Sequence, residues 1–179
     1  IPQTSTVKKN KSHRSRTQLD ATTLPFWDDF SYASELQNMP NDTLWEYGRT
    51  VWVNNGAGIN PPSLGVATFD GIDSVGKPYS VNDILAKGIA DRLISRPLRM
   101  DLVDVVDRES VFLSFYFQMR GNGEPPDAGD RLIISVKNDL GKWDILKEIE
   151  NDGTLQSDQF YSVILPISGD QYFHDNFQF

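Results

Sequence analysis

The chain has 179 residues, of which 39% are hydrophobic, and its 17 basic and 25 acidic residues give a net charge of −8. This length suits one domain with a substantial core, and no run approaches the roughly 20 apolar residues that cross a bilayer, so we expect no membrane-spanning segment. The absence of cysteine excludes a disulfide scaffold and a thiolate metal site, and only two histidines, His13 and His174, leave little for histidine-based chemistry.

The N-terminal stretch, residues 1–23, differs from the rest of the chain. It is polar, lacks a helical or strand period, and carries one acidic residue against five basic ones: Lys8, Lys9, Lys11, Arg14 and Arg16. We expect this arm to be disordered, because it cannot offset its ordering entropy. The alternative is a basic tether that docks on an acidic partner or a membrane surface. The remaining residues, 24–179, form an acidic domain, which excludes nucleic-acid binding by that part.

Alternating apolar residues predict the first strands. Trp45, Tyr47, Val51 and Val53 share one face of a strand over 45–53, and turn residues at 54–56 and 60–62 precede a second strand over 64–70. Trp52 is out of phase with its apolar neighbours, so we expect it on the less apolar face, available to a sugar or a protein.

Further strands follow along the chain. They are predicted at Leu98–Leu102, where Leu98, Met100 and Leu102 alternate, and over 111–119, 132–136, 143–149 and 161–167. The strand over 111–119 has the clearest pattern, with apolar residues at every odd position. Residues 138–141 predict a hairpin loop, and 81–87 predicts a helical turn with Asn82 or Ser80 as its cap.

These short strands with turns between them predict an all-β fold, an antiparallel sandwich or jelly roll. We expect three of the four tryptophans, Trp27, Trp45 and Trp143, in its core. Phe177–Phe179 alternates as a strand does, and we expect the natural protein to continue with at least one more strand.

Several sequence stretches resemble a domain of secreted Bacteroidota proteins. They are LPFWDDFS at 24–31, PSLGVATFDGID at 62–73, GKPY at 76–79, ADRLISRPL at 90–98 and VFLSFYFQ at 111–118. Their order is similar to that of MAM and concanavalin-A-like jelly rolls, over residues 24–179. The chain departs from the pattern in one inserted arginine, Arg96, and in lacking the disulfides of animal MAM domains.

The resemblance implies a link to type IX secretion and gliding motility. It implies an extracytoplasmic protein, in the periplasm, at the outer membrane or on the cell surface. The leading hypothesis is a non-enzymatic protein-binding module, an accessory subunit or a passenger of the secretion system, with the outer-membrane translocon barrel as partner. The alternative is a carbohydrate-binding or adhesin module, because such folds host lectins, adhesion modules and enzymes alike.

The carboxylates do not predict an active site. Glu148, Glu150 and Asp152 alternate, but the turn at 151–153 is expected to end their strand before the three align, so glycoside hydrolysis is not expected. A structural calcium ion at Asp28, Asp29, Asp70 and Asp73 is an open alternative without a compact ligand motif, and no other cofactor is expected.

For two surface features the sequence suggests a function without deciding it. The loop over 121–130 is either a binding loop or a plain crossover. Thr43 and Ser74 each follow an aspartate and precede an aliphatic residue, which resembles the O-glycosylation signal of Bacteroidota.

Overall fold

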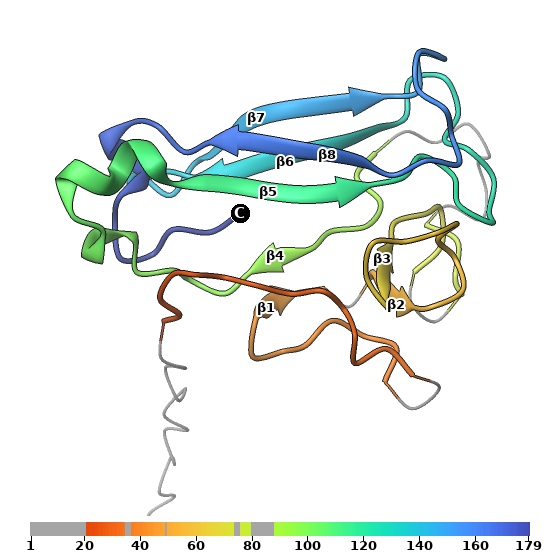
Figure 1. Ribbon diagram of the computed structural model, residues 1–179, viewed down its shortest axis with the longest axis horizontal. Helices are drawn as coiled ribbons and strands as arrows, with labels where there is room; N and C mark the ends of the chain where they lie inside the picture. The colour runs from red at the N-terminus through yellow and green to blue at the C-terminus, as the bar shows by residue number, and fades with distance from the viewer. Residues whose placement is uncertain (1–20, 35–36, 49, 74–75, 80–87) are drawn as a thin grey trace, which may run out of the picture.

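The computed structural model describes residues 21–34, 37–48, 50–73, 76–79 and 88–179 (Figure 1). Its strands form four antiparallel pairs: β1 (Trp45–Tyr47) with β4 (Ile94–Ser95), β2 (Trp52–Asn54) with β3 (Val66–Thr68), β5 (Phe112–Phe117) with β8 (Tyr161–Pro166), and β6 (Arg131–Lys137) with β7 (Trp143–Glu150). The helical segments within these ranges are 3-10 turns: η1 (Met100–Leu102), η2 (Val105–Ser110) and η3 (Asp170–Tyr172). The all-β prediction is confirmed, whereas the sandwich or jelly roll stays a prediction.

Some predicted features lie outside the described residues. These are the five basic residues of the arm (Lys8, Lys9, Lys11, Arg14 and Arg16), the glycosylation candidate Ser74, and the helical turn over 81–87. Just before the predicted start of the domain at residue 24, the Thr22 backbone already pairs with Leu98, and its N–H donates to the Pro97 carbonyl at 3.0 Å.

The β5–β8 pair follows the predicted alternation. Phe112 lies opposite Pro166 and Phe117 opposite Tyr161, with unbroken register between them. Leu113, Phe115 and Phe117 are half-buried, and the even-numbered residues of β5 are exposed. This alternation confirms the strand predicted over 111–119 and its inward face.

The β6–β7 hairpin confirms the predicted loop, but the prediction that Ile145 and Ile149 share one face of β7 is wrong. The Asn138 N–H donates to the Lys142 carbonyl, and Gly141 adopts a positive φ of 73° that favours glycine. Between Ile134 and Ser135 the pairing partners jump from Lys147 to Ile145, which leaves Leu146 as an extra residue on β7. This bulge changes the phase of β7, so Ile149 is buried while Ile145 is exposed, contrary to the single face predicted for them.

Two other strand predictions are corrected. Residues 100–102 form the 3-10 turn η1, so Leu98 and Met100 are buried but Leu102 is exposed. The strand predicted over 45–53 is divided between β1 and β2, which pair with different partners, and Tyr47 is exposed although Trp45 is buried. In both places an interruption of the extended backbone removes the two-residue period on which the prediction depended.

The last three residues lie between two strand pairs (Figure 1). Leu98 N–H donates to the Phe177 carbonyl at 2.8 Å, and Ser95 N–H donates to the Phe179 carbonyl at 2.9 Å. From the opposite side, Lys137 N–H donates to the Gln178 carbonyl at 2.9 Å. Phe177–Phe179 therefore connects the β4 side of the molecule to the end of β6.

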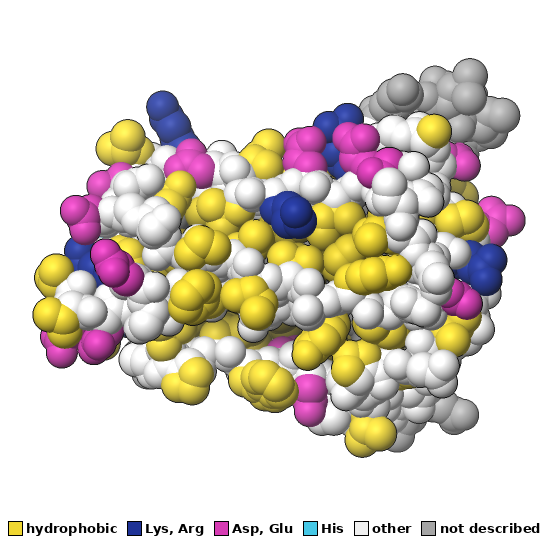
Figure 2. Space-filling model, turned by 45° about the horizontal axis from the view of Figure 1, so that its top comes forward, with side chains coloured by type: hydrophobic (Ala, Val, Ile, Leu, Met, Phe, Trp, Pro, Cys, Tyr) yellow, Lys and Arg dark blue, Asp and Glu magenta, His cyan; other side chains and the backbone are white. Residues whose placement is uncertain are grey.

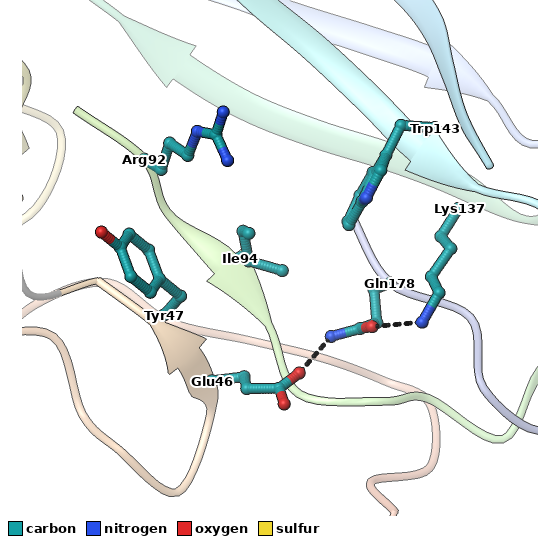
Figure 3. A pocket seen from close by; sticks show the side chains of 7 residues that line it. All are labelled: Glu46, Tyr47, Arg92, Ile94, Lys137, Trp143 and Gln178. Carbon is teal, nitrogen blue, oxygen red and sulfur yellow. Dashed lines mark hydrogen bonds between the residues drawn. The ribbon is translucent and has the colours of Figure 1, made fainter. Parts of the chain in front are cut away.

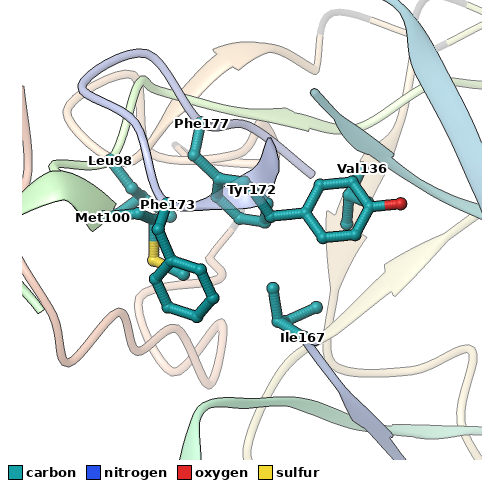
Figure 4. Packing of buried hydrophobic residues seen from close by; sticks show 7 residues of the cluster. All are labelled: Leu98, Met100, Val136, Ile167, Tyr172, Phe173 and Phe177. Carbon is teal, nitrogen blue, oxygen red and sulfur yellow. The ribbon is translucent and has the colours of Figure 1, made fainter. Parts of the chain in front are cut away.

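The buried hydrophobic core includes Phe177 of this segment. Its members come from β6, from η3 and from the segments after β4 and β8 (Figure 4): Leu98, Met100, Val136, Ile167, Tyr172, Phe173 and Phe177. Phe179 belongs to a second aromatic group, in which its ring centroid lies 5.0 Å from that of Phe26 and 5.7 Å from that of Trp45.

We predict that Phe179→Ala lowers the free energy of unfolding by about 2 kcal/mol, because it removes a half-buried ring from two edge-to-face contacts. Urea denaturation measures this loss. Phe69→Ala is the matched control, since Phe69 is exposed. An equal loss in both variants would show that Phe179 does not stabilise the connection.

Candidate binding surfaces

Asp28 is the polar centre of the aromatic group around Trp45. Its Oδ2 accepts hydrogen bonds from Trp45 Nε1 at 2.7 Å and from the Tyr32 hydroxyl at 3.1 Å, while its Oδ1 accepts the Phe30 N–H at 2.9 Å. Burial raises the pKa of Tyr32, so that hydroxyl stays protonated and donates. Both oxygens of Asp28 therefore accept hydrogen bonds that connect the segment over 28–32 to Trp45.

The other aspartates predicted as cation ligands make local contacts. Asp29 accepts the Ser31 N–H, Asp70 accepts the Ile72 N–H, and Asp73 accepts the Lys77 N–H. Within the described ranges, no three histidine, cysteine, aspartate or glutamate side chains are grouped so that they could hold a metal ion. The structure therefore does not bring the four aspartates together as a site.

The alternating carboxylates of β7 are engaged by arginine. Arg131 Nη1 lies 2.8 Å from Glu148 Oε2 and 3.5 Å from Glu150 Oε1. Asp152 lies beyond the end of β7, as predicted, where hydrogen bonds from Thr154 lower the pKa of its carboxyl. The structure therefore places Asp152 outside the strand that carries Glu148 and Glu150, and Arg131 pairs with both glutamates.

The pair of Asp91 and Tyr79, of which Asp91 is half-buried and Tyr79 is exposed, has raised pKa values. Burial raises the pKa of Asp91, which accepts hydrogen bonds from the Tyr79 hydroxyl and the Asp70 N–H. Burial likewise raises the pKa of Tyr79 to about 12. The phenol stays protonated at neutral pH and serves as a donor, so the pair is a structural hydrogen bond between a loop and the segment before β4.

The outer face of β5–β8 is apolar. Because the two strands pair in register, Phe112, Tyr116, Ile164 and Pro166 point to the same side. Phe112 is 54% exposed, Tyr116 62% and Ile164 65%. Hydrophobic side chains occupy much of the face of the molecule drawn in Figure 2, with most acidic and basic side chains toward its margins. The sequence contained a signal for this surface, since Phe112 and Tyr116 are apolar or aromatic residues at even positions, opposite the predicted apolar face of β5.

The tryptophan expectations are met for two residues and wrong for two. Trp45 is buried, and Trp52 is 46% exposed beside the fully buried Val51 and Val53, so its predicted phase is confirmed. Trp27 and Trp143 are exposed instead of buried. Trp27 follows Phe26, which packs inward, and Trp143 lies on the outer side of β7, where the bulge places it.

Trp52 lies beside polar groups. It pairs with Thr68, and the neighbouring Asn54 Nδ2 donates to Thr68 Oγ1 at 2.7 Å on the same face. An exposed indole next to an amide and a hydroxyl is an arrangement that can stack on a sugar ring and hydrogen-bond its hydroxyl groups. The glycosylation candidate Thr43 is also exposed, in a turn, and its hydroxyl donates to Asn41 Oδ1.

A pocket of about 390 Å³ opens next to the C-terminal segment (Figure 3). It is lined by Glu46, Tyr47, Arg92, Ile94, Lys137, Trp143 and Gln178. Gln178 is buried at its base, where Nε2 donates to Glu46 Oε2 at 2.5 Å and to the Ser95 carbonyl at 2.8 Å, and Oε1 accepts from Lys137 Nζ at 2.9 Å. The sequence patterns did not predict that these residues form one pocket, because they come from five separate segments.

The loop after β5 packs against the loop after β2. Asn122 N–H donates to the Ala57 carbonyl at 2.7 Å, and the Gln118 amide bonds both the N–H and the carbonyl of Ile59. Gln118 was not predicted as important, yet it connects positions 59 residues apart. The contact of Asn122 gives the beginning of the 121–130 loop a structural role. Binding by the rest of this loop stays a prediction.

The described part of the chain contains no helix with the length and apolar character needed to span a membrane. No protein-family model matches the sequence, and no curated protein or solved structure matches it either.

We predict that Asp28→Ala lowers the free energy of unfolding by about 3 kcal/mol, because it leaves the Trp45 indole N–H and the Tyr32 hydroxyl without their acceptor. Thermal unfolding followed by tryptophan fluorescence measures the loss. Asp29→Ala is the control, since Asp29 accepts only from the nearby Ser31, and we expect it to cost less than about 1 kcal/mol. Equal effects at the two positions would contradict the role of Asp28.

Proposed function

We propose that the chain is a non-enzymatic, extracytoplasmic β-sandwich that acts by binding protein. The observation that carries this proposal is the apolar outer face of β5–β8, formed by Phe112, Tyr116, Ile164 and Pro166. Contiguous exposed apolar surface is costly in water, and on soluble proteins it marks sites of association.

The biological setting of the proposal comes from the sequence resemblance. It assigns the chain to the type IX secretion and gliding-motility apparatus of Bacteroidota, as an accessory subunit or a passenger, in the periplasm or at the cell surface. The partner is then the outer-membrane translocon barrel. The β5–β8 face supports this role because Ser114 and Ser162 are its only polar side chains between the apolar ones, which suits a protein surface of similar character.

The test is affinity purification from native membranes with the wild-type chain and with Ile164→Asp. We expect the wild type to co-purify an outer-membrane barrel, and the variant to lose at least about tenfold of it, because a buried unpaired carboxylate opposes association. Ile145→Asp is the matched control, the same change at an exposed isoleucine on the outer face of β7. Far-ultraviolet circular dichroism checks that both variants fold. Recovery of the barrel at the wild-type level by Ile164→Asp would contradict the proposed surface.

Carbohydrate binding is the second candidate, and the exposed Trp52 with Asn54 and Thr68 favours it. If this candidate holds, the chain binds oligosaccharides on a glycan array, and Trp52→Ala removes most of that binding by removing the stacking surface. Trp27→Ala is the control, because Trp27 is exposed in a different segment. Binding to no glycan, or equal binding by both variants, would eliminate this candidate.

A further inference from the structure

The η1–η2 end of the molecule, residues 100–110, carries exposed aliphatic side chains. Leu102 is 59% exposed, Val105 73% and Val106 87%. Figure 2 shows hydrophobic side chains among acidic ones at the left end of the view, where η1 and η2 lie in Figure 1. Because aliphatic surface in contact with water favours burial, this end of the molecule favours an occupant that covers it.

Acidic side chains lie between these aliphatic ones. Asp104, Asp107 and Glu109 are exposed, and none of them forms an ion pair or a side-chain hydrogen bond with another described residue. The arginine between them does not compensate their charge, because Arg108 Nη1 lies 2.9 Å from Asp170 Oδ1. The η1–η2 end therefore combines aliphatic surface with three carboxylates that a basic occupant could pair with.

The basic N-terminal stretch joins the described structure next to this end. Thr22 N–H donates to the Pro97 carbonyl at 3.0 Å, and Arg99 N–H donates to the Thr22 carbonyl at 2.9 Å. Met100, which follows Arg99, begins η1. Figure 1 shows the described chain beginning beside the segment that leads into η1. These backbone hydrogen bonds fix the point to which residues 1–20 are attached.

Charge and chain length both fit this stretch to the η1–η2 end. Residues 1–20 contain one acidic residue and five basic ones, which are Lys8, Lys9, Lys11, Arg14 and Arg16. Arg16 precedes Thr22 by six residues and Asp104 follows Arg99 by five, and neither length can span more than about 22 Å. A basic segment attached at this distance has a high effective concentration at the carboxylates. The hydrocarbon stems of lysine and arginine can cover valine while their charged groups meet carboxylates.

We propose that the basic stretch over 8–16 docks on the η1–η2 end of its own chain. Its charged groups pair with the three carboxylates, and its hydrocarbon stems cover the two exposed valines. The acidic loop over 121–130 lies beyond the opposite end of β5, which makes the η1–η2 end the nearer site. The inference goes beyond the proposed function, because it assigns a binding site to the arm and uses no residue of the β5–β8 face.

Spin labelling of the full chain tests this docking. The chain has no cysteine, so Ser12→Cys provides one attachment site for a nitroxide within the basic stretch. At low salt we expect the nitroxide to broaden the amide signals of Val105 and Val106 at least about threefold more than those of Phe117 and Tyr161, at the far end of the β5–β8 pair. In 1 M salt, where the screening length is about 3 Å, this difference should be lost.

Neutralising the three carboxylates identifies the surface. The test variant combines Asp104→Asn, Asp107→Asn and Glu109→Gln. The matched control makes the same change of charge at exposed carboxylates in the loops beyond the other end of β5: Glu124→Gln, Asp127→Asn and Asp158→Asn. We expect the test variant to reduce the broadening at Val105 and Val106 at least about threefold, and the control to leave it unchanged. Two-dimensional amide spectra check that both variants fold.

Equal losses in the two variants, or broadening that 1 M salt does not change, would overturn the proposal. A mixture of nitroxide-labelled chain with isotope-labelled chain that lacks the nitroxide separates docking within one chain from docking on another copy. Broadening in this mixture as strong as that within one chain would show that the arm binds a second copy, and the assignment to its own chain would be wrong. Because no partner is used, this result does not depend on the membrane purification.

Discussion

Three residues at the end of the chain carry the connection on which the rest of the structure depends. Strands of two or three residues, such as β1 and β4, are too short to be stable by themselves. Phe177–Phe179 joins them to the longer β6–β7 hairpin through backbone hydrogen bonds on both sides. Phe177 packs in the main hydrophobic core, and Phe179 packs against the rings of Phe26 and Trp45. The side chain of Gln178, between them, forms hydrogen bonds with Glu46 and Lys137.

Several charged residues also make contacts within the fold. Asp28 binds the Trp45 indole beneath Phe179, the β7 glutamates pair with Arg131, and Lys137 and Glu46 are held by Gln178. The surfaces on which the proposed binding depends are the apolar face of β5–β8 and the exposed indole of Trp52.

Alternation in the sequence predicted the long strands well, because each of these strands has one face toward the core along its whole length. β5, β6 and β8 follow their patterns residue by residue. The pattern failed at β7, where the extra residue Leu146 changes the phase, and at 100–102, where a 3-10 turn replaces extended backbone. Trp143 was assigned to the wrong side for the first of these reasons.

The sequence by itself determined the all-β character, the inward faces of the long strands and the outward position of Trp52, since these depend on the two-residue period of an extended backbone. Only the tertiary structure decided which residues lie together on one surface or in one pocket. The pocket at Gln178 combines side chains from β1, β4, β6, β7 and the chain end, and the apolar face of β5–β8 requires strands about 50 residues apart to pair in register. Such proximity arises from long-range pairing and packing, which no local pattern in the sequence encodes.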